Sequence, residues 1–123
     1  MRRMSTEKTS YTGGCHCQKV RFNVQAELGT LLSCNCSICS KRGALLAFVP
    51  ASDVQVLSGE DELQTYKFNK MHIAHKFCKT CGILPFANAN DKEGKPTYAI
   101  NARCLDGVDV KKFPVHEYDG ASV

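Results

Sequence analysis

The sequence predicts a mostly β domain in which small antiparallel sheets are joined by zinc and little helix is present. Short apolar runs have the period of two that is typical of half-buried strands, and turn-forming residues separate them. Seven of the eight cysteines also fall into three tight clusters. A chain of 123 residues with 43% hydrophobic residues is long enough for one modest core. We therefore expect bound metal to help hold this small domain together.

Individual elements follow from the pattern along the chain. Residues 1–10 show no periodicity, so we expect a disordered leader followed by a single domain over residues 11–123. In the first expected strand, Val20, Phe22 and Val24 alternate with polar residues. Helical periodicity is weak, and a single helical turn is expected after Cys36 or near residues 109–113. Further strands are expected at residues 31–34, 44–49, 54–57, 63–68, 73–77, 84–87 and 97–102.

Composition and charge argue against membrane and nucleic-acid partners. No apolar run approaches the ~18 residues of a membrane-spanning helix, and no apolar segment follows the polar N-terminus as in a signal peptide. We therefore expect a cytoplasmic protein, whose reducing surroundings favour metal binding over disulfides. Seven thiolates and two zinc ions would reduce the formal charge of +4 to +1, and the basic residues are scattered along the chain.

Two of the clusters have the spacing of a closed zinc site with four protein ligands. In an extended segment, Cys15 and Cys17 point to the same face. The turn Cys78-Lys79-Thr80-Cys81 can place two thiolates on one ion, and Gly82 tolerates the positive φ often needed next. A shared structural zinc would close the long loop between the halves. The alternatives are a redox CxxC pair, for which no βαβ pattern is present, and buried cysteines without a ligand.

The third cluster, Cys34-Asn35-Cys36-Ser37-Ile38-Cys39, offers three thiolates to a second zinc. A zinc ion with three protein ligands keeps one position for a substrate, and a thiolate-rich site suits a soft thiol ligand. We therefore treat Cys34, Cys36 and Cys39 as both the second metal site and the candidate catalytic site. A lone histidine is more often an ordinary polar residue, and we expect Cys104 to be an ordinary buried residue rather than a ligand. The candidates for a fourth ligand are nevertheless Cys104, His16, His72, His75 and His116.

These motifs together resemble those of the glutathione-dependent formaldehyde-activating enzyme family, which also includes centromere protein V. The resemblance runs from Thr12 to about Asp106. It rests on Gly13-Gly14-Cys15-His16-Cys17, on the cluster of residues 34–39, on Phe48-Val49-Pro50-Ala51 and on His75-Lys76-Phe77-Cys78-Lys79-Thr80-Cys81-Gly82. Two positions depart from the family pattern: Gln18 stands where Gly is frequent, and Ile83 where a small hydroxyl residue is frequent.

The resemblance implies a β-tent fold of small sheets joined by two zinc ions per chain. By position, Cys15, Cys17, Cys78 and Cys81 match the structural zinc ligands of the family, and residues 34, 36 and 39 match the ligands of its catalytic zinc. The founding activity joins glutathione and formaldehyde into S-(hydroxymethyl)glutathione and is classed as a carbon–sulfur lyase. The founding enzyme is longer than this chain.

The resulting hypothesis is a zinc-dependent carbon–sulfur lyase acting on a small thiol, such as glutathione, and its aldehyde adduct. Lys41-Arg42 could then attract a carboxylate of the thiol or form a solvated surface pair. A further hypothesis puts His75 near the structural metal. One alternative is a non-catalytic zinc module that binds protein or nucleic acid. Another is zinc or redox sensing through Cys36 or Cys39. The sequence indicates neither a general acid or base nor an oligomeric state.

Overall fold

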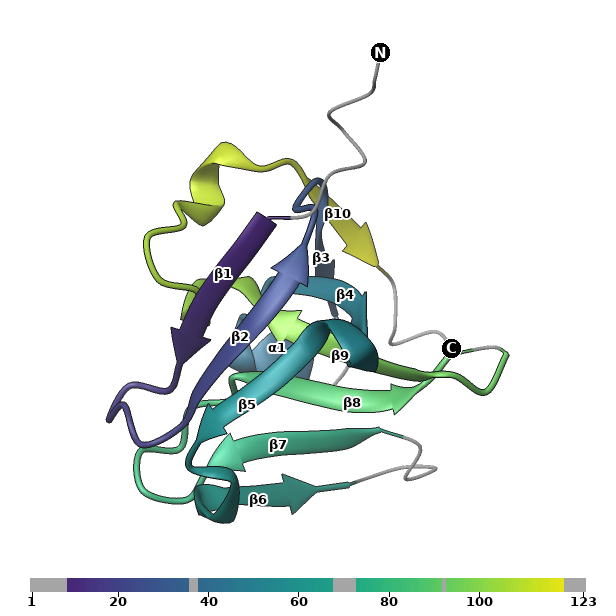
Figure 1. Ribbon diagram of the computed structural model, residues 1–123. Coiled ribbons are helices and arrows are strands. Elements are labelled where there is room, and N and C mark those ends of the chain that lie inside the picture. Colours follow the sequence, from purple (N-terminus) through teal and green to yellow (C-terminus); the bar gives the residue numbers. More distant parts are fainter. Residues whose placement is uncertain (1–8, 36–37, 68–72, 92, 119–123) are drawn as a thin grey trace.

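The structure of the chain is a computed structural model that describes residues 9–35, 38–67, 73–91 and 93–118. The described residues form mainly strands, with one short helix and several 3-10 turns (Figure 1). Helix α1 spans Cys39–Arg42, and the 3-10 turns are η2 (Ala51–Asp53), η3 (Glu60–Glu62), η4 (Ala102–Cys104) and η5 (Val110–Lys112). The strands are β1 (Thr9–Gly14), β2 (Arg21–Ala26), β3 (Leu31–Cys34), β4 (Leu46–Pro50), β5 (Val54–Ser58), β6 (Leu63–Tyr66), β7 (Ala74–Cys78), β8 (Phe86–Asn90), β9 (Pro96–Asn101) and β10 (Val115–Tyr118).

The strands form two sheets. The smaller sheet is antiparallel with the order β1-β2-β5, and the larger has seven strands in the order β10-β3-β4-β9-β8-β7-β6. The expectation of a mostly β chain with little helix is confirmed. Among the described strands, neighbours pair antiparallel except that β10 runs parallel to β3. The N–H of Leu31 donates to the carbonyl of Pro114, and the N–H of Asn35 donates to that of Tyr118, so both ends of β3 are held by the returning chain.

Strands β1 and β10 carry no strong sequence signal. β1 pairs with β2 along its whole length, with Thr9 opposite Ala26 and Ser10 opposite Gln25. The strand therefore begins inside the segment that we expected to be a leader, whereas residues 1–8 lie outside the described residues. β10 is exposed along its length and lacks the apolar alternation of an isolated strand. Both strands form because a neighbouring strand satisfies their backbone groups, which local sequence does not reveal.

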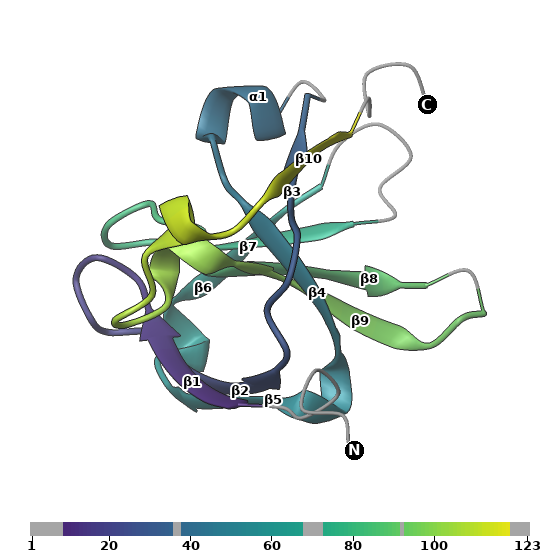
Figure 2. The ribbon, with the colours of Figure 1, turned by 90° about the horizontal axis from the view of Figure 1, so that it is seen from above.

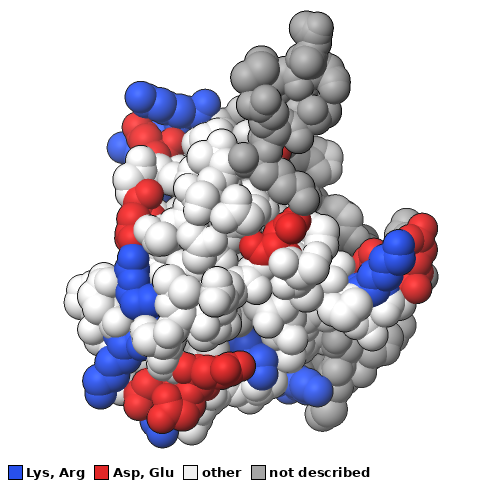
Figure 3. All heavy atoms as spheres, in the orientation of Figure 1, with Lys and Arg blue, Asp and Glu red and all other residues white. Residues whose placement is uncertain are grey.

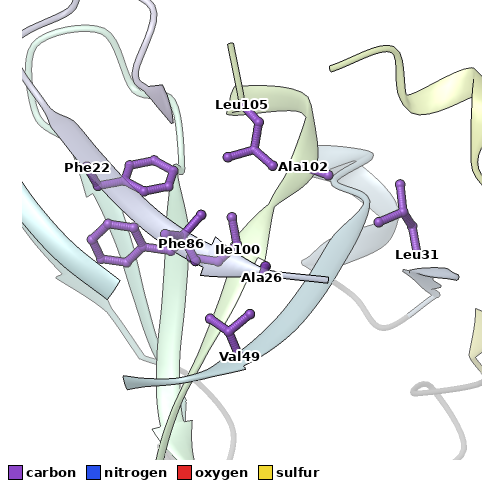
Figure 4. Packing of buried hydrophobic residues seen from close by; sticks show 9 residues of the cluster. Phe22, Ala26, Leu31, Val49, Phe86, Ile100, Ala102 and Leu105 are labelled. Atoms are coloured by element: carbon purple, nitrogen blue, oxygen red, sulfur yellow. The ribbon is translucent and has the colours of Figure 1, made fainter. Parts of the chain in front are cut away.

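The main core lies between the two sheets. In β2, Phe22, Val24 and Ala26 are buried and alternate with partly exposed polar residues, as the pattern predicts. Phe22 meets Phe86 of β8 edge to face, with ring centroids 5.6 Å apart and an interplanar angle of 89° (Figure 4). The other buried members of this cluster are Leu31, Val49, Ile100, Ala102 and Leu105.

The larger sheet therefore has one face on this core and one face directed away from it. Figure 2 shows α1 on the side of β4, β7, β8 and β9 that lies opposite the small sheet. On the face of the molecule drawn in Figure 3, basic and acidic side chains are interspersed and form no continuous basic surface. Within the described residues, no helix has the length and hydropathy of a membrane-spanning segment.

Candidate metal centre and cavity

The structure brings four of the clustered cysteines together at one end of the two sheets. Cys15 and Cys17 lie in the connection between β1 and β2, Cys78 is the last residue of β7, and Cys81 lies in the turn that follows. Their sulfur atoms all lie within 4.8 Å of one another. The Sγ atom of Cys17 is 3.5 Å from that of Cys15 and 3.6 Å from that of Cys78. The group therefore connects the small sheet with the large one.

Two tight backbone turns position these thiols. The N–H of Gly82 donates to the carbonyl of Cys78 at 2.7 Å, and Gly82 has a φ of 82°. Glycine adopts this left-handed conformation without the clash that a Cβ atom causes, as the sequence indicated. On the other side, Gln18 has a φ of 72° although it carries a side chain. Its side-chain oxygen accepts from Arg21 at 2.8 Å, which helps hold the turn. Glycine would adopt this conformation without the strain that a side chain brings.

The pKa values of two of these thiols are shifted in opposite directions. The backbone N–H of Lys19 favours the thiolate of Cys17, but burial and hydrogen bonds with the other three sulfurs outweigh it and raise the pKa to about 12. Burial disfavours the thiolate of Cys81, but hydrogen bonds from the backbone of Ile83 and from neighbouring sulfurs lower its pKa to about 6. Thiolates this close together repel one another, and a bound dication would offset that repulsion.

Two of the sulfur–sulfur distances in this group fit a tetrahedral zinc site. Four thiolates at about 2.3 Å from a tetrahedral zinc are roughly 3.8 Å from one another. The Sγ–Sγ distances of 3.5 and 3.6 Å lie close to that value and far above the roughly 2.05 Å of a disulfide. Cys15 and Cys78 are buried, and all four are free thiols. The residues present could therefore hold a metal ion in a closed site.

The third cysteine cluster is described in part. Cys34 ends β3 and Cys39 begins α1, and both thiols are half-buried. The two residues line the same cavity. Cys36, the middle residue of the expected ligand set, lies outside the described residues. The turn of helix expected after Cys36 is α1, which ends at Gly43 with a φ of 69°.

The cavity on this side of the large sheet has a volume of about 610 Å³. Its floor follows from strand register. Phe48 of β4 lies opposite Ala99 of β9, Ala99 opposite Ala87 of β8, and Ala87 opposite His75 of β7. These four residues line the cavity, whereas their strand neighbours Val49 and Ile100 enter the core. Because two alanines lie between two larger side chains, the face is hollow in the middle.

Two ionisable side chains distinguish the wall of this cavity. His75 is buried, with a relative exposure of 6%, and burial first and the positive charge of Arg42 second lower the pKa of its imidazole. Burial also lowers the pKa of Arg42, against the opposing effects of Cys39 and Tyr66. A histidine with a lowered pKa is neutral at pH 7 and can donate one N–H hydrogen bond. A guanidinium and a neutral imidazole therefore line the same cavity as Cys39.

The location of His75 corrects one expectation. We expected this side chain near the structural metal, but it is three residues before Cys78 on the same strand. An odd separation directs two side chains to opposite faces of a strand. His75 thus lines the cavity, while Cys78 belongs to the four-cysteine group.

The other candidates for a fourth ligand lie elsewhere. The thiol of Cys104 donates to the carbonyl of Leu84 at 3.6 Å and is not among the described residues that line the cavity. Burial, followed by the charges of Cys15 and Cys81, raises the pKa of Cys104 to about 11. His16 and His116 are exposed. His72 lies outside the described residues.

Comparison with known proteins decides the family. A sequence model of the glutathione-dependent formaldehyde-activating enzyme family matches residues 10–118. The chain belongs to this family. A crystal structure of a Rhodobacter sphaeroides protein has a similar fold, with a TM-score of 0.74 and 32% sequence identity. The match covers 85% of this chain and 99% of that one. The resemblance inferred from the cysteine motifs is thereby confirmed.

Both cysteine regions lie within the part of the chain that matches the glutathione-dependent formaldehyde-activating enzyme family. The matched range includes the four-cysteine group, the cluster at residues 34–39 and the strands that form the floor of the cavity. The family description associates the chain with glutathione and formaldehyde chemistry. Sequence motifs identified the thiols. The floor of the cavity was missed, although the alternation of Phe48 and Val49 and of Ala99 and Ile100 could have indicated a second apolar face.

Proposed function

We propose that the chain is a zinc-dependent carbon–sulfur lyase that joins a small thiol, such as glutathione, to an aldehyde and splits the adduct. The observation that carries this proposal is the large cavity lined by Cys34 and Cys39 in a member of this family. A carbon–sulfur lyase needs a site that binds sulfur and excludes water around the carbonyl carbon. The two thiols and the apolar lining meet these needs.

Two zinc ions per chain are part of the proposal. Cys15, Cys17, Cys78 and Cys81 would hold a structural ion that joins the two sheets, and the closeness of their sulfur atoms supports this part of the proposal. Cys34, Cys36 and Cys39 would hold a second ion with an open position. When bound there, zinc favours the thiolate of a substrate thiol at neutral pH. We place the activity in a reducing compartment such as the cytoplasm, because the ligands must remain thiolates.

The proposed reaction is an addition whose atoms balance. The sulfur of the thiol forms a bond to the carbonyl carbon, the carbon–oxygen π bond breaks, and the thiol proton ends on the new hydroxyl oxygen. Arg42 of the chain can bind a carboxylate of the thiol from the cavity wall. The neutral imidazole of His75 can donate a hydrogen bond to the carbonyl oxygen as negative charge develops there. The reverse reaction expels the thiol.

The test compares two cysteine variants in turnover. Cys39→Ser removes a thiol from the cavity, whereas Cys104→Ser changes a half-buried cysteine that does not line it. The rate of adduct formation from glutathione and formaldehyde, followed by stopped flow against the uncatalysed rate, should fall by at least about a hundredfold in Cys39→Ser. The Cys104→Ser variant should keep the wild-type rate. Equal rates for Cys39→Ser and wild type would refute the mechanism.

No observation favours the non-catalytic alternative to the same degree. An interaction module with a closed second metal site would use Cys104 as the fourth ligand, and that thiol instead donates to Leu84. The interspersed charges of Figure 3 also offer no continuous basic surface on that face for a nucleic-acid backbone. We therefore retain the enzyme as the proposed function.

A further inference from the structure

The cavity is much larger and more apolar than a one-carbon aldehyde requires. Its volume of about 610 Å³ falls in the range of roughly 300–1,000 Å³ that is typical of sites for larger organic ligands. Formaldehyde has two non-hydrogen atoms, so the rest of this space is left for the thiol and for any substituent of the aldehyde. The size and lining of the cavity therefore indicate which kind of aldehyde or thiol the site accepts.

The hollow floor is built from small side chains. Between Phe48 and His75, the row across the sheet contains only the methyl groups of Ala99 and Ala87. Three strand spacings of about 4.8 Å separate the two ends of this row, roughly 14 Å in all. An extended carbon chain can lie across the two alanines and contact both ends. Leucine at either alanine would occupy that space.

The lining is mainly apolar, and its polar side chains include Arg42, His75, Asn88, Asn90, Asp91 and Thr97. Among the described lining residues, Arg42 and Asp91 carry formal charges, and His75 is held toward its neutral form. The two carboxylates and the ammonium group of glutathione would lose hydration against the remaining apolar wall. Its charged ends are better placed near Arg42 and the cavity mouth. The interior is suited to an apolar group that is attached to the sulfur or to the carbonyl carbon. Apolar side chains of the wall include Leu32, Leu46, Phe48, Ile73 and Leu84.

We propose that the natural aldehyde of this enzyme carries an apolar substituent of several carbon atoms, which lies on the Ala87–Ala99 floor. This inference rests on the proposed function, because it names the substrate class of that site. The adduct would be the hemithioacetal of a small thiol and an aliphatic or aromatic aldehyde. The covalent step is the addition described above, so no further reactant is needed.

A binding experiment tests the apolar subsite without turnover. S-methyl-, S-butyl- and S-hexylglutathione are unreactive thioethers that mimic adducts of increasing length. Titration calorimetry of the wild-type protein should give a Kd that falls about fourfold for each added methylene until the cavity is filled. Ala99→Leu should remove most of this dependence. The exposed Gln64→Leu on β6 adds the same side chain outside the lining and should preserve it.

Turnover then separates the two proposals. With glutathione as the thiol, kcat/KM should be at least tenfold higher for hexanal than for formaldehyde, and Ala99→Leu should reduce that ratio by at least tenfold. If formaldehyde reacts as fast as hexanal and the thioethers bind with equal Kd values, the apolar substrate class is overturned while the lyase activity stands. If no aldehyde is turned over, the proposed function fails, and with it this substrate assignment.

Discussion

The four-thiol group is expected to provide a large share of the stability of the fold. Cys17 and Cys78 are 61 residues apart in the chain, and their sulfur atoms are 3.6 Å apart. A metal bound to both constrains the unfolded chain as a cross-link does. The chain-entropy relation for a loop of this length gives about 4 kcal/mol. Since domains of this size unfold with about 5–15 kcal/mol, loss of the link should remove about a quarter or more of the total.

The perturbation is Cys17→Ser, which removes one ligand and changes little volume. We expect its free energy of unfolding, measured by urea denaturation of the zinc-loaded protein, to be lower than wild type by about 4 kcal/mol. Treating the wild-type protein with a strong chelator should have a similar effect. The matched control is Cys104→Ser, because the new hydroxyl can still donate to Leu84, and we expect a change below about 1 kcal/mol.

Metal analysis by mass spectrometry accompanies each unfolding curve. The reasoning would be refuted if the chelated wild-type protein, shown to be free of zinc, unfolded at the same urea concentration as the loaded protein. It would also be refuted if Cys17→Ser and Cys104→Ser had equal stabilities and equal zinc contents.

Three further predictions concern the core, a surface pair and the cavity. Phe22→Ala should lower the free energy of unfolding by about 3–5 kcal/mol in urea, because a fully buried ring is lost from its contact with Phe86. A hydrogen bond from Arg21 and a second from Thr12 hold the pKa of Asp106 below its usual value, so the carboxylate stabilises the fold at neutral pH. Asp106→Asn should therefore lower the free energy of unfolding in urea by about 0.5–1 kcal/mol at pH 7. This difference between the variant and the wild type should vanish once acid protonates the wild-type carboxyl. A difference that stays constant at all pH values would contradict the prediction. His75→Ala should slow adduct formation, measured by stopped flow, about a hundredfold. The urea unfolding curve of the variant checks that it is folded. An unchanged rate would exclude the proposed role of the imidazole.

Local patterns predicted the strands whose side chains alternate between a buried and an exposed face. β2 was predicted from Phe22 and Val24, and the expected segment at residues 31–34 coincides with β3. β1 and β10 were not predicted, because pairing with distant strands forms them and their own apolar content is low. The parallel direction of β10 depends on the path of residues 105–114, which has no short-range signature.

As with the strands, the sequence predicted part of the candidate site: the clustered thiols, but not the cavity. Cysteine spacing indicated which thiols lie together, and the four-cysteine group has the composition that the spacing predicts. The cavity was not predicted, because its floor depends on the register that aligns Phe48, Ala99, Ala87 and His75 across four strands. Register between strands distant in sequence is a property of the assembled sheet. Once it is known, the direction of His75 follows from its odd spacing to Cys78.

The most direct test of the open thiol-binding site is native mass spectrometry of the purified protein titrated with glutathione. We expect two zinc ions per chain and a saturable glutathione complex that disappears in Cys39→Ser and persists in Cys104→Ser. A single zinc ion, or two zinc ions with no glutathione complex in the wild-type protein, would rule out the open site.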